Sequence, residues 1–172
     1  MTDTHLTHIK LVLLDVDGVL TTGQIIYDDS GLETKVFHVR DGLGIRMLME
    51  VGIKVGIVTG RSCPALTHRC RNLGLTLIKD GVHDKTAALD EILKETGVSA
   101  ADTAFVGDDL PDLSIMGQVG VSIAVGDAHE LVKKRALFTT RANGGCGAIR
   151  EISERILKAK GDWEPLIERL FT

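Results

Sequence analysis

Acidic side chains directly follow two of the most apolar segments of the chain. Asp15 and Asp17 come after the run LVLL, with a glycine next, and Asp108, Asp109 and Asp112 come after the run AFVG. Carboxylates crowded in this way repel one another unless a cation lies between them, and oxygen ligands select Mg²⁺ or Ca²⁺. The pattern indicates a metal site and a carboxylate, Asp15, placed to act as a nucleophile. A solvated turn is the alternative for each acidic group taken alone.

Two further apolar segments end in groups that suit an anion. Thr59 and Gly60 follow the run VGIV and can present a hydroxyl and backbone N–H groups to a phosphate. Lys85 begins a predicted helix, where a cation is unfavourable for the helix dipole, and this favours a lysine directed at a phosphate over a solvated one. The four segment ends together supply a nucleophile, an acid, phosphate ligands and a metal site.

These residues need a scaffold that brings the ends of the apolar runs together. Short apolar runs alternate with helical patterns, which predicts a doubly wound, Rossmann-like α/β fold whose parallel sheet is covered on both faces. Ligands bind at the carboxyl edge of such a sheet. The predicted strands are 9–14, 54–58, 75–78, 103–106, 121–125 and 136–139, and the predicted helices are 43–51, 64–73, 85–96, 110–117, 128–135 and 148–159.

One segment, residues 22–39, departs from this alternation. Two β-prone stretches flank the turn-forming residues DDSG at 28–31, which predicts a β-hairpin inserted after the first strand, with an irregular loop as the alternative. The length of 172 residues suits a single domain over 1–172, ending in a tail at about 141–172. The short intervals between motifs leave no room for a cap domain, so we expect a capless site that a neighbouring subunit covers.

Composition narrows the possible partners. The net charge of −4 and the absence of a basic stripe argue against nucleic acid. No apolar run approaches the ~18 residues of a membrane span, and no secretory signal begins the sequence. The three cysteines, Cys63, Cys70 and Cys146, are odd in number and lack a zinc spacing, which predicts free thiols in a reducing cytoplasm.

The order of these motifs resembles the haloacid dehalogenase superfamily of phosphatases. DVDGVLT at 15–21, VTGR at 58–61, the lysine of GVHDK at 81–85 and GDDLPDL at 107–113 are similar to its four motifs. A narrower resemblance, to phosphatases of 3-deoxy-D-manno-octulosonate 8-phosphate, is carried by FHVRDGLG at 37–44, VTGRS and NGGCGAIRE at 143–151. Thr22 departs from this pattern, because Asp is expected there.

The resemblance implies a Mg²⁺ enzyme that acts through an aspartyl-phosphate. Mg²⁺ would be held by the Asp15 carboxylate, the Asp17 backbone carbonyl and the Asp108 carboxylate. Asp15 would attack phosphorus, and Asp17 would serve as general acid and then general base. The phosphoryl group would be held by Thr59, Gly60 and Lys85. Asp109 and Asp112 would orient metal-bound water and the lysine, with capping of the next helix as the alternative for Asp112.

The narrower resemblance implies a phosphorylated sugar acid as substrate, in lipopolysaccharide precursor synthesis, and a homotetramer in which hairpins meet and tails reach adjacent sites. Arg61 is predicted to pair with the sugar carboxylate. A surface arginine is the alternative for Arg61. Arg40 and Arg150 are further candidates for substrate binding, and a surface salt bridge is the alternative for Arg150. The glycine-rich loop 143–147 is predicted to close over a neighbour's site, unless it is a simple connector.

Three other functions fit parts of the pattern. A related nine-carbon sugar acid phosphate is an alternative substrate, and a catalytically idle assembly module related to sugar cytidylyltransferases shares many of the motifs. A signalling receiver domain also combines acidic residues, Thr and Lys at strand ends. In receivers the acidic cluster precedes the Thr and Lys, whereas here a second cluster follows Lys85. The phosphatase therefore fits best.

Overall fold

A six-stranded parallel sheet forms the centre of the computed structural model, which describes residues 3–171. The strand order is β5-β4-β1-β6-β7-β8, so the chain runs outward in opposite directions from β1. This reversal opens a crevice at the carboxyl ends of the central strands. The predicted doubly wound sheet is confirmed. Its strands are β1 (Leu11–Leu14), β4 (Lys54–Val58), β5 (Leu77–Lys79), β6 (Thr103–Gly107), β7 (Val121–Ala124) and β8 (Phe138–Thr139).

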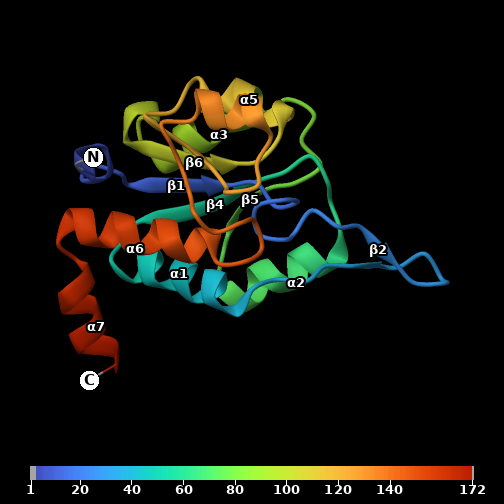
Figure 1. Ribbon diagram of the computed structural model, residues 1–172, viewed down its shortest axis with the longest axis horizontal. Coiled ribbons are helices and arrows are strands. Elements are labelled where there is room, and N and C mark those ends of the chain that lie inside the picture. The colour runs from blue at the N-terminus through green and yellow to red at the C-terminus, as the bar shows by residue number, and fades with distance from the viewer. Residues whose placement is uncertain (1–2, 172) are drawn as a thin grey trace.

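Helices cover both faces of the sheet (Figure 1). One face carries α1 (Val39–Glu50), α2 (Pro64–Leu73) and α6 (Ala148–Lys160), and the other carries α3 (Lys85–Thr96) and α5 (Glu130–Arg135). The short α4 (Leu113–Met116) contacts α3, and the chain ends in α7 (Trp163–Phe171). Because helices enclose the sheet, every residue of β1 and β6 is buried, as their continuously apolar sequences predict.

A two-stranded hairpin follows β1 and projects from the body of the molecule (Figure 1). Its strands are β2 (Ile26–Tyr27) and β3 (Glu33–Thr34), paired antiparallel. The Asp28 Oδ1 atom accepts hydrogen bonds from the backbone N–H groups of Ser30 at 2.9 Å and Leu32 at 2.8 Å, which closes the turn. The predicted hairpin and the capless design are both confirmed, since only the hairpin separates β1 from α1 in the described chain.

Some predicted boundaries differ from the structure. The helix predicted over 110–117 divides into a 3-10 turn, Leu110–Asp112, and α4, and the Asp112 side chain holds this turn by accepting hydrogen bonds from the Asp108 and Asp109 backbone. Helix α1 begins four residues before its predicted start, where the His38 side chain accepts a hydrogen bond from the Arg40 backbone. Further 3-10 turns span Asp3–Leu6 and Ala100–Asp102.

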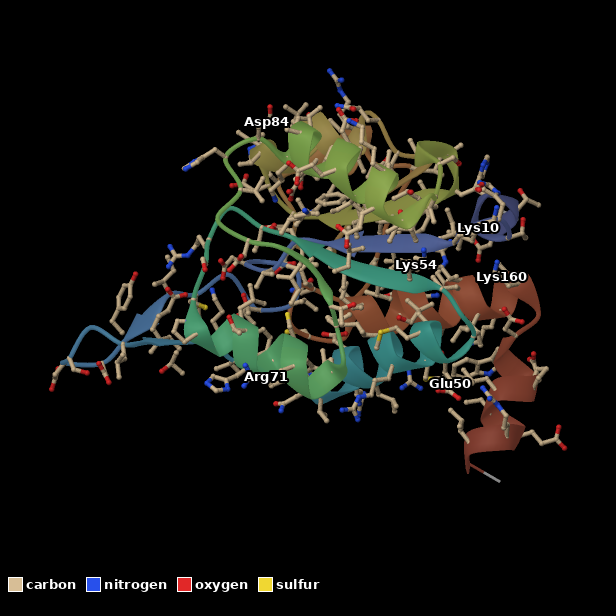
Figure 2. The ribbon with its side chains drawn as sticks, turned by 180° about the vertical axis from the view of Figure 1, so that it is seen from behind. Lys10, Glu50, Lys54, Arg71, Asp84 and Lys160 are labelled. Carbon is tan, nitrogen blue, oxygen red and sulfur yellow. The ribbon has the colours of Figure 1, made fainter. Side chains whose placement is uncertain are left out.

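The two edges of the sheet differ in the partners of their charged side chains. At the amino edge, Lys10, Lys54 and Lys160 lie close to one another (Figure 2). Lys10 pairs with Asp102 at 2.8 Å, while Lys54 and Lys160 donate to backbone carbonyls at 2.8 and 2.9 Å. These lysines therefore bind partners within the fold. The cluster of acidic side chains predicted from the sequence lies at the carboxyl edge instead.

The cysteines are free, as predicted: Cys63 and Cys70 are buried and Cys146 is exposed. Among the described residues, no helix combines the length and the apolar character needed to cross a bilayer.

Candidate active site

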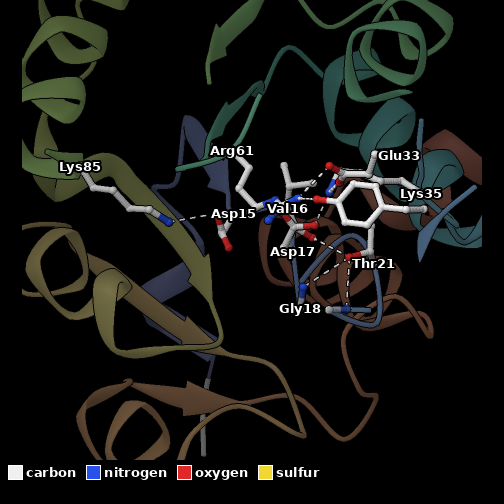
Figure 3. A network of polar contacts seen from close by, with 11 residues as sticks. Asp15, Val16, Asp17, Gly18, Thr21, Glu33, Lys35, Arg61 and Lys85 are labelled. Atoms are coloured by element: carbon white, nitrogen blue, oxygen red, sulfur yellow. Dashed lines mark hydrogen bonds and ion pairs between the residues drawn. The ribbon is translucent and has the colours of Figure 1, made fainter. Parts of the chain in front are cut away.

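The carboxyl ends of β1 and β6 meet the start of α3 in a buried cluster of charged side chains. The Lys85 Nζ atom lies 2.9 Å from Asp15 Oδ1 and 2.6 Å from Asp112 Oδ1. Asp84 fixes the start of α3, because its side chain accepts hydrogen bonds from the backbone of Thr86 and Ala87. This cap places Lys85 at the first helical position, with its side chain extending toward Asp15 (Figure 3).

Three carboxylates in this cluster are close enough to hold one cation. One oxygen from each of Asp15, Asp108 and Asp112 lies within 4.8 Å of the others. Burial raises the pKa of Asp15 to about 6, and burial together with the Asp15 and Asp112 charges raises the pKa of Asp108 to about 8. Burial dominates both shifts: Lys85 only partly offsets it at Asp15, and Asp108 also has carboxylate neighbours. Hard oxygen donors with unbalanced negative charge fit Mg²⁺.

Asp112 differs from the other two carboxylates because protein donors occupy both of its oxygens. Lys85 binds Oδ1, while the backbone N–H groups of Asp108 and Asp109 donate to Oδ2 at 2.8 and 3.3 Å. Asp15 and Asp108 are therefore the better metal ligands. Asp112 fixes both the lysine and the loop after β6, which agrees with the orienting role predicted for it.

A glycine allows the loop after β1 to approach Asp108. Gly18 has a φ of +88°, and a Cβ atom at this position would lie 2.0 Å from Asp108 Oδ2. Only glycine combines this left-handed backbone with the space that Asp108 needs. The loop carrying Asp17 consequently closes on Asp108 across the site.

Lys85 stays charged in its buried position. Burial alone would lower its pKa, but the Asp15 and Asp112 carboxylates outweigh burial and raise the pKa. Its ammonium group therefore remains available to an incoming phosphate.

The predicted site residues line one cavity of about 990 Å³. Thr59, at the end of β4, is almost fully buried, whereas Gly60 is exposed. The structure thus brings together the predicted nucleophile, acid, metal ligands and phosphate ligands. The members of this set are Asp15, Asp17, Thr59, Gly60, Arg61, Lys85, Asp108, Asp109 and Asp112.

The Asp17 side chain faces the hairpin and enters a second ionic network (Figure 3). Its Oδ1 atom accepts a hydrogen bond from Lys35, and its Oδ2 atom lies 3.5 Å from Arg61 Nε. Glu33 binds both cations, at 2.8 Å from Lys35 Nζ and 2.7 Å from the Arg61 guanidinium. Sequence reasoning missed Glu33 and Lys35, although a spacing of two in a β-prone segment favours side chains on one face.

Arg61 lies at the cavity, as predicted, and there it pairs with Glu33. Its role in binding a sugar carboxylate stays a prediction. The other two predicted substrate residues, Arg40 and Arg150, do not line the cavity of this chain. The Arg40 side chain is exposed at the start of α1, and Arg150 pairs with Glu154 at 2.7 Å. Arg150 therefore has the surface salt bridge that was its alternative role.

The glycine-rich loop 143–147 packs against its own chain. The Gly145 N–H group donates to the Val19 carbonyl at 2.8 Å, and a Cβ atom on Gly144 would lie 1.7 Å from the Gly18 carbonyl oxygen. Asp41 accepts hydrogen bonds from the backbone of Gly147 and Arg150, which caps α6. The backbone of this loop is therefore held beside the Asp17 loop of its own chain, and its closure over a neighbour's site stays a prediction.

The fold and this cluster are those of a haloacid dehalogenase-like hydrolase, and a family model of that description matches residues 75–152. A 3-deoxy-D-manno-octulosonate 8-phosphate phosphatase of Haemophilus influenzae is 46% identical, over 91% of this chain and 87% of that protein. The Escherichia coli enzyme of the same name is 44% identical, over 90% of this chain and 82% of its own. The chain belongs to the family of 3-deoxy-D-manno-octulosonate 8-phosphate phosphatases.

Solved structures agree with this assignment. The phosphatase of Yersinia pestis superposes with a TM-score of 0.93 at 42% identity, covering 95% of this chain and 88% of that one. The phosphatase of Moraxella catarrhalis, solved with a magnesium ion, a phosphate ion and a KDO molecule, gives a TM-score of 0.95 at 40% identity and covers 98% of both chains.

Proposed function

We propose that this chain hydrolyses 3-deoxy-D-manno-octulosonate 8-phosphate to the free sugar acid and phosphate, a step toward lipopolysaccharide precursors. The observation that carries the proposal is the buried Asp15 held by Lys85 at 2.9 Å beside Asp108. The names of the relatives support the eight-carbon substrate over a nine-carbon one. An idle assembly module is disfavoured, because each position that the chemistry needs is filled.

The chemistry divides into two displacements at phosphorus. Asp15 attacks, the ester P–O bond breaks, and Asp17 gives a proton to the departing sugar alkoxide. Asp17 then removes a proton from the water that attacks the aspartyl-phosphate, which releases phosphate and restores Asp15. Thr59, the Gly60 backbone and Lys85 hold the phosphoryl oxygens while charge spreads over them.

The metal would be held by the Asp15 and Asp108 carboxylates and the Asp17 backbone carbonyl. When bound, Mg²⁺ neutralises phosphate charge and lets a carboxylate approach the phosphorus atom. Asp109 lies at the rim of the same cavity, where it can hold metal-bound water. Arg61 is our candidate for the sugar carboxylate, because a guanidinium pairs with a carboxylate through two hydrogen bonds.

Self-association belongs to the same proposal. Exposed large apolar side chains gather on the hairpin and the start of α1, namely Ile25, Ile26, Tyr27, Leu32, Val36, Val39 and Leu43. Such a patch is typical of a protein interface. We infer a homotetramer of single-domain chains built around the hairpins, whose sites are covered by neighbours. The three free thiols favour a cytoplasmic location.

A phosphate-release assay over phosphorylated sugar acids tests the function. We expect Mg²⁺-dependent turnover that is highest for the octulosonate phosphate. Asp15→Asn should lower kcat by at least ~10³-fold with an unchanged Tm, because an amide cannot form the acyl phosphate. Lys10→Met, which removes a surface ion pair at the opposite edge, is the matched control. Turnover like that of the unmodified protein in Asp15→Asn would contradict the proposal.

A further inference from the structure

Two lysines hold the two carboxylates of the Asp15–Asp17 motif, and each lysine is shared with a second acid. Their side chains are 8% exposed for Lys85 and 2% exposed for Lys35. Lys85 joins Asp15 to Asp112. Lys35 joins Asp17 to Glu33 in the same manner, but it comes from the hairpin rather than from the sheet. The proposed function uses the first arrangement and leaves the second without a role.

The Lys35 side chain is inaccessible to a substrate. It is 2% exposed, and neither it nor Glu33 lines the cavity, whereas Asp17 does. Lys35 therefore lies behind Asp17 as seen from the site. Burying an ammonium group costs free energy unless ion pairs compensate, and Asp17 and Glu33 supply both of its ion pairs.

Lys35 also supplies the hydrogen bond that holds the Asp17 side chain. Within residues 3–171, Asp17 Oδ2 has no hydrogen-bond partner, and Arg61 Nε lies 3.5 Å from it. Asp17 follows the end of β1 in a turn, so no strand or helix fixes its side chain. An acid–base group must be held in place to transfer protons efficiently.

We propose that Lys35 is a positioning residue for the acid–base step: it holds the Asp17 carboxylate in the orientation from which Asp17 protonates the leaving sugar and activates water. The proposal rests on the proposed function. It gives the hairpin a second task in addition to self-association, because Glu33 of β3 binds Lys35, which directly follows that strand. Docking of the hairpin then determines whether Asp17 is oriented for proton transfer.

Lys35→Met tests the proposal, because methionine keeps most of the side-chain volume and removes the charge. We expect kcat for the sugar phosphate to fall by about 10–100-fold, with a KM change below ~3-fold, since proton transfer contributes to kcat. Lys35→Arg should recover most of the activity. Lys10→Met serves as the control, because its surface ion pair lies at the opposite edge.

A double-mutant cycle separates positioning from a structural role. p-Nitrophenyl phosphate is the substrate, because its leaving group departs without a proton and Asp17→Asn should keep a measurable rate. If Lys35 acts through Asp17, then Lys35→Met should cost less than ~2-fold in kcat in the Asp17→Asn background, far less than in the unmodified protein. Equal losses in both backgrounds would overturn the proposal, as would full activity of Lys35→Met.

Two measurements keep the test decisive. Tm and Mg²⁺ affinity are determined for every variant, and Lys35→Gln replaces Lys35→Met in the cycle if the latter does not fold. A loss of kcat that only follows a loss of Mg²⁺ affinity, restored by excess Mg²⁺, would also overturn the proposal. If the unmodified protein hydrolyses the aryl phosphate but no sugar acid phosphate, the proposed substrate fails while the cycle remains valid.

Discussion

Four carboxylates at the ends of β1 and β6 are buried or half-buried and require counter-charges, which the chain does not supply equally to all of them. Asp15 and Asp112 share Lys85, and Asp17 has Lys35, but Asp108 lies among carboxylates. Burial and the neighbouring negative charges raise the pKa of Asp108 to about 8, because no cation offsets them fully. Asp108 is thus the residue whose charge depends most on a bound cation.

This imbalance predicts how pH and Mg²⁺ affect stability. The folded metal-free protein keeps a proton on Asp108 up to about pH 8, whereas the unfolded chain releases it near the ordinary carboxyl pKa of about 4. Because the folded state binds more protons in that window, the free energy of unfolding should fall as pH rises through it. Mg²⁺ requires the ionised carboxylate, so its stabilisation should grow with pH.

Thermal unfolding checks this prediction. The Tm increase caused by Mg²⁺ should be larger at about pH 8.5 than at about pH 6, and EDTA should abolish it. Asp108→Asn should remove most of the difference between the two pH values. An equal Mg²⁺ effect at both values in the unmodified protein would refute the link to Asp108.

Single residues were predictable where local sequence carried the signal. Asp15 and Asp108 follow apolar strands directly, so their meeting at the carboxyl edge follows from the fold alone. Lys35 and Asp17 both lie outside helices and strands. No sequence periodicity therefore predicts that the hairpin packs so as to bring these two side chains together. The prediction that Arg150 binds substrate rests on its charge alone and stays untested, and in this chain Arg150 pairs with Glu154 one helical turn away.

At the scale of elements, the site depends on a loop distant in sequence from the motifs. The loop 143–147 lies against residues 18–22, and Gly144 also donates to Asp127 Oδ1 at 2.8 Å. Asp41, in α1, caps α6 immediately after this loop. Two helices therefore hold the loop, and the loop supports the backbone that carries Asp17.

Gly144→Ala tests this support. A Cβ atom would lie 1.7 Å from the Gly18 carbonyl oxygen, so the two loops must separate. We expect a loss of about 1–3 kcal/mol in the free energy of unfolding, as for other overpacked sites, together with weaker Mg²⁺ binding. Gly117→Ala is the control, because its nearest contact would be an ordinary 3.6 Å. Unchanged Tm and Mg²⁺ affinity in Gly144→Ala would show that the loop supports nothing.

Elements were predicted well where burial is continuous and less well where it is partial. The strands and the hairpin are present, because apolar runs and turn residues define them locally. The start of α1 was missed because Val39 is exposed and Gly42 weakens the helical pattern. The glycines of the loop 143–147 predict a flexible cover, which stays untested, but they do not reveal that Gly144 and Gly145 pack closely against residues 18–22.

At the scale of the whole molecule, the hairpin and α7 lie at opposite ends (Figure 1). Helix α7 folds onto its own chain: Leu166 is buried, and Arg169 pairs with Glu50 at 3.2 Å. The predicted reach of the tail into an adjacent site stays a prediction. The hairpin presents apolar side chains to solvent and lies beside the cavity, so it is the better-placed element to join subunits at the site.

Charged substitutions in the hairpin test this arrangement. Ile25 and Leu32 are 49% and 66% exposed, so a single chain should tolerate Ile25→Glu and Leu32→Glu together with little change in Tm. An interface between subunits would not tolerate these substitutions, because the new carboxylates would be buried there without partners. We expect light scattering to report a smaller particle, and the rate on the sugar phosphate to fall about 10-fold or more while the small p-nitrophenyl phosphate is still hydrolysed. Leu137→Glu, at a 46% exposed position away from the hairpin, should change neither property. A double variant that keeps the mass and the sugar phosphate activity of the unmodified protein would exclude the hairpin from the interface.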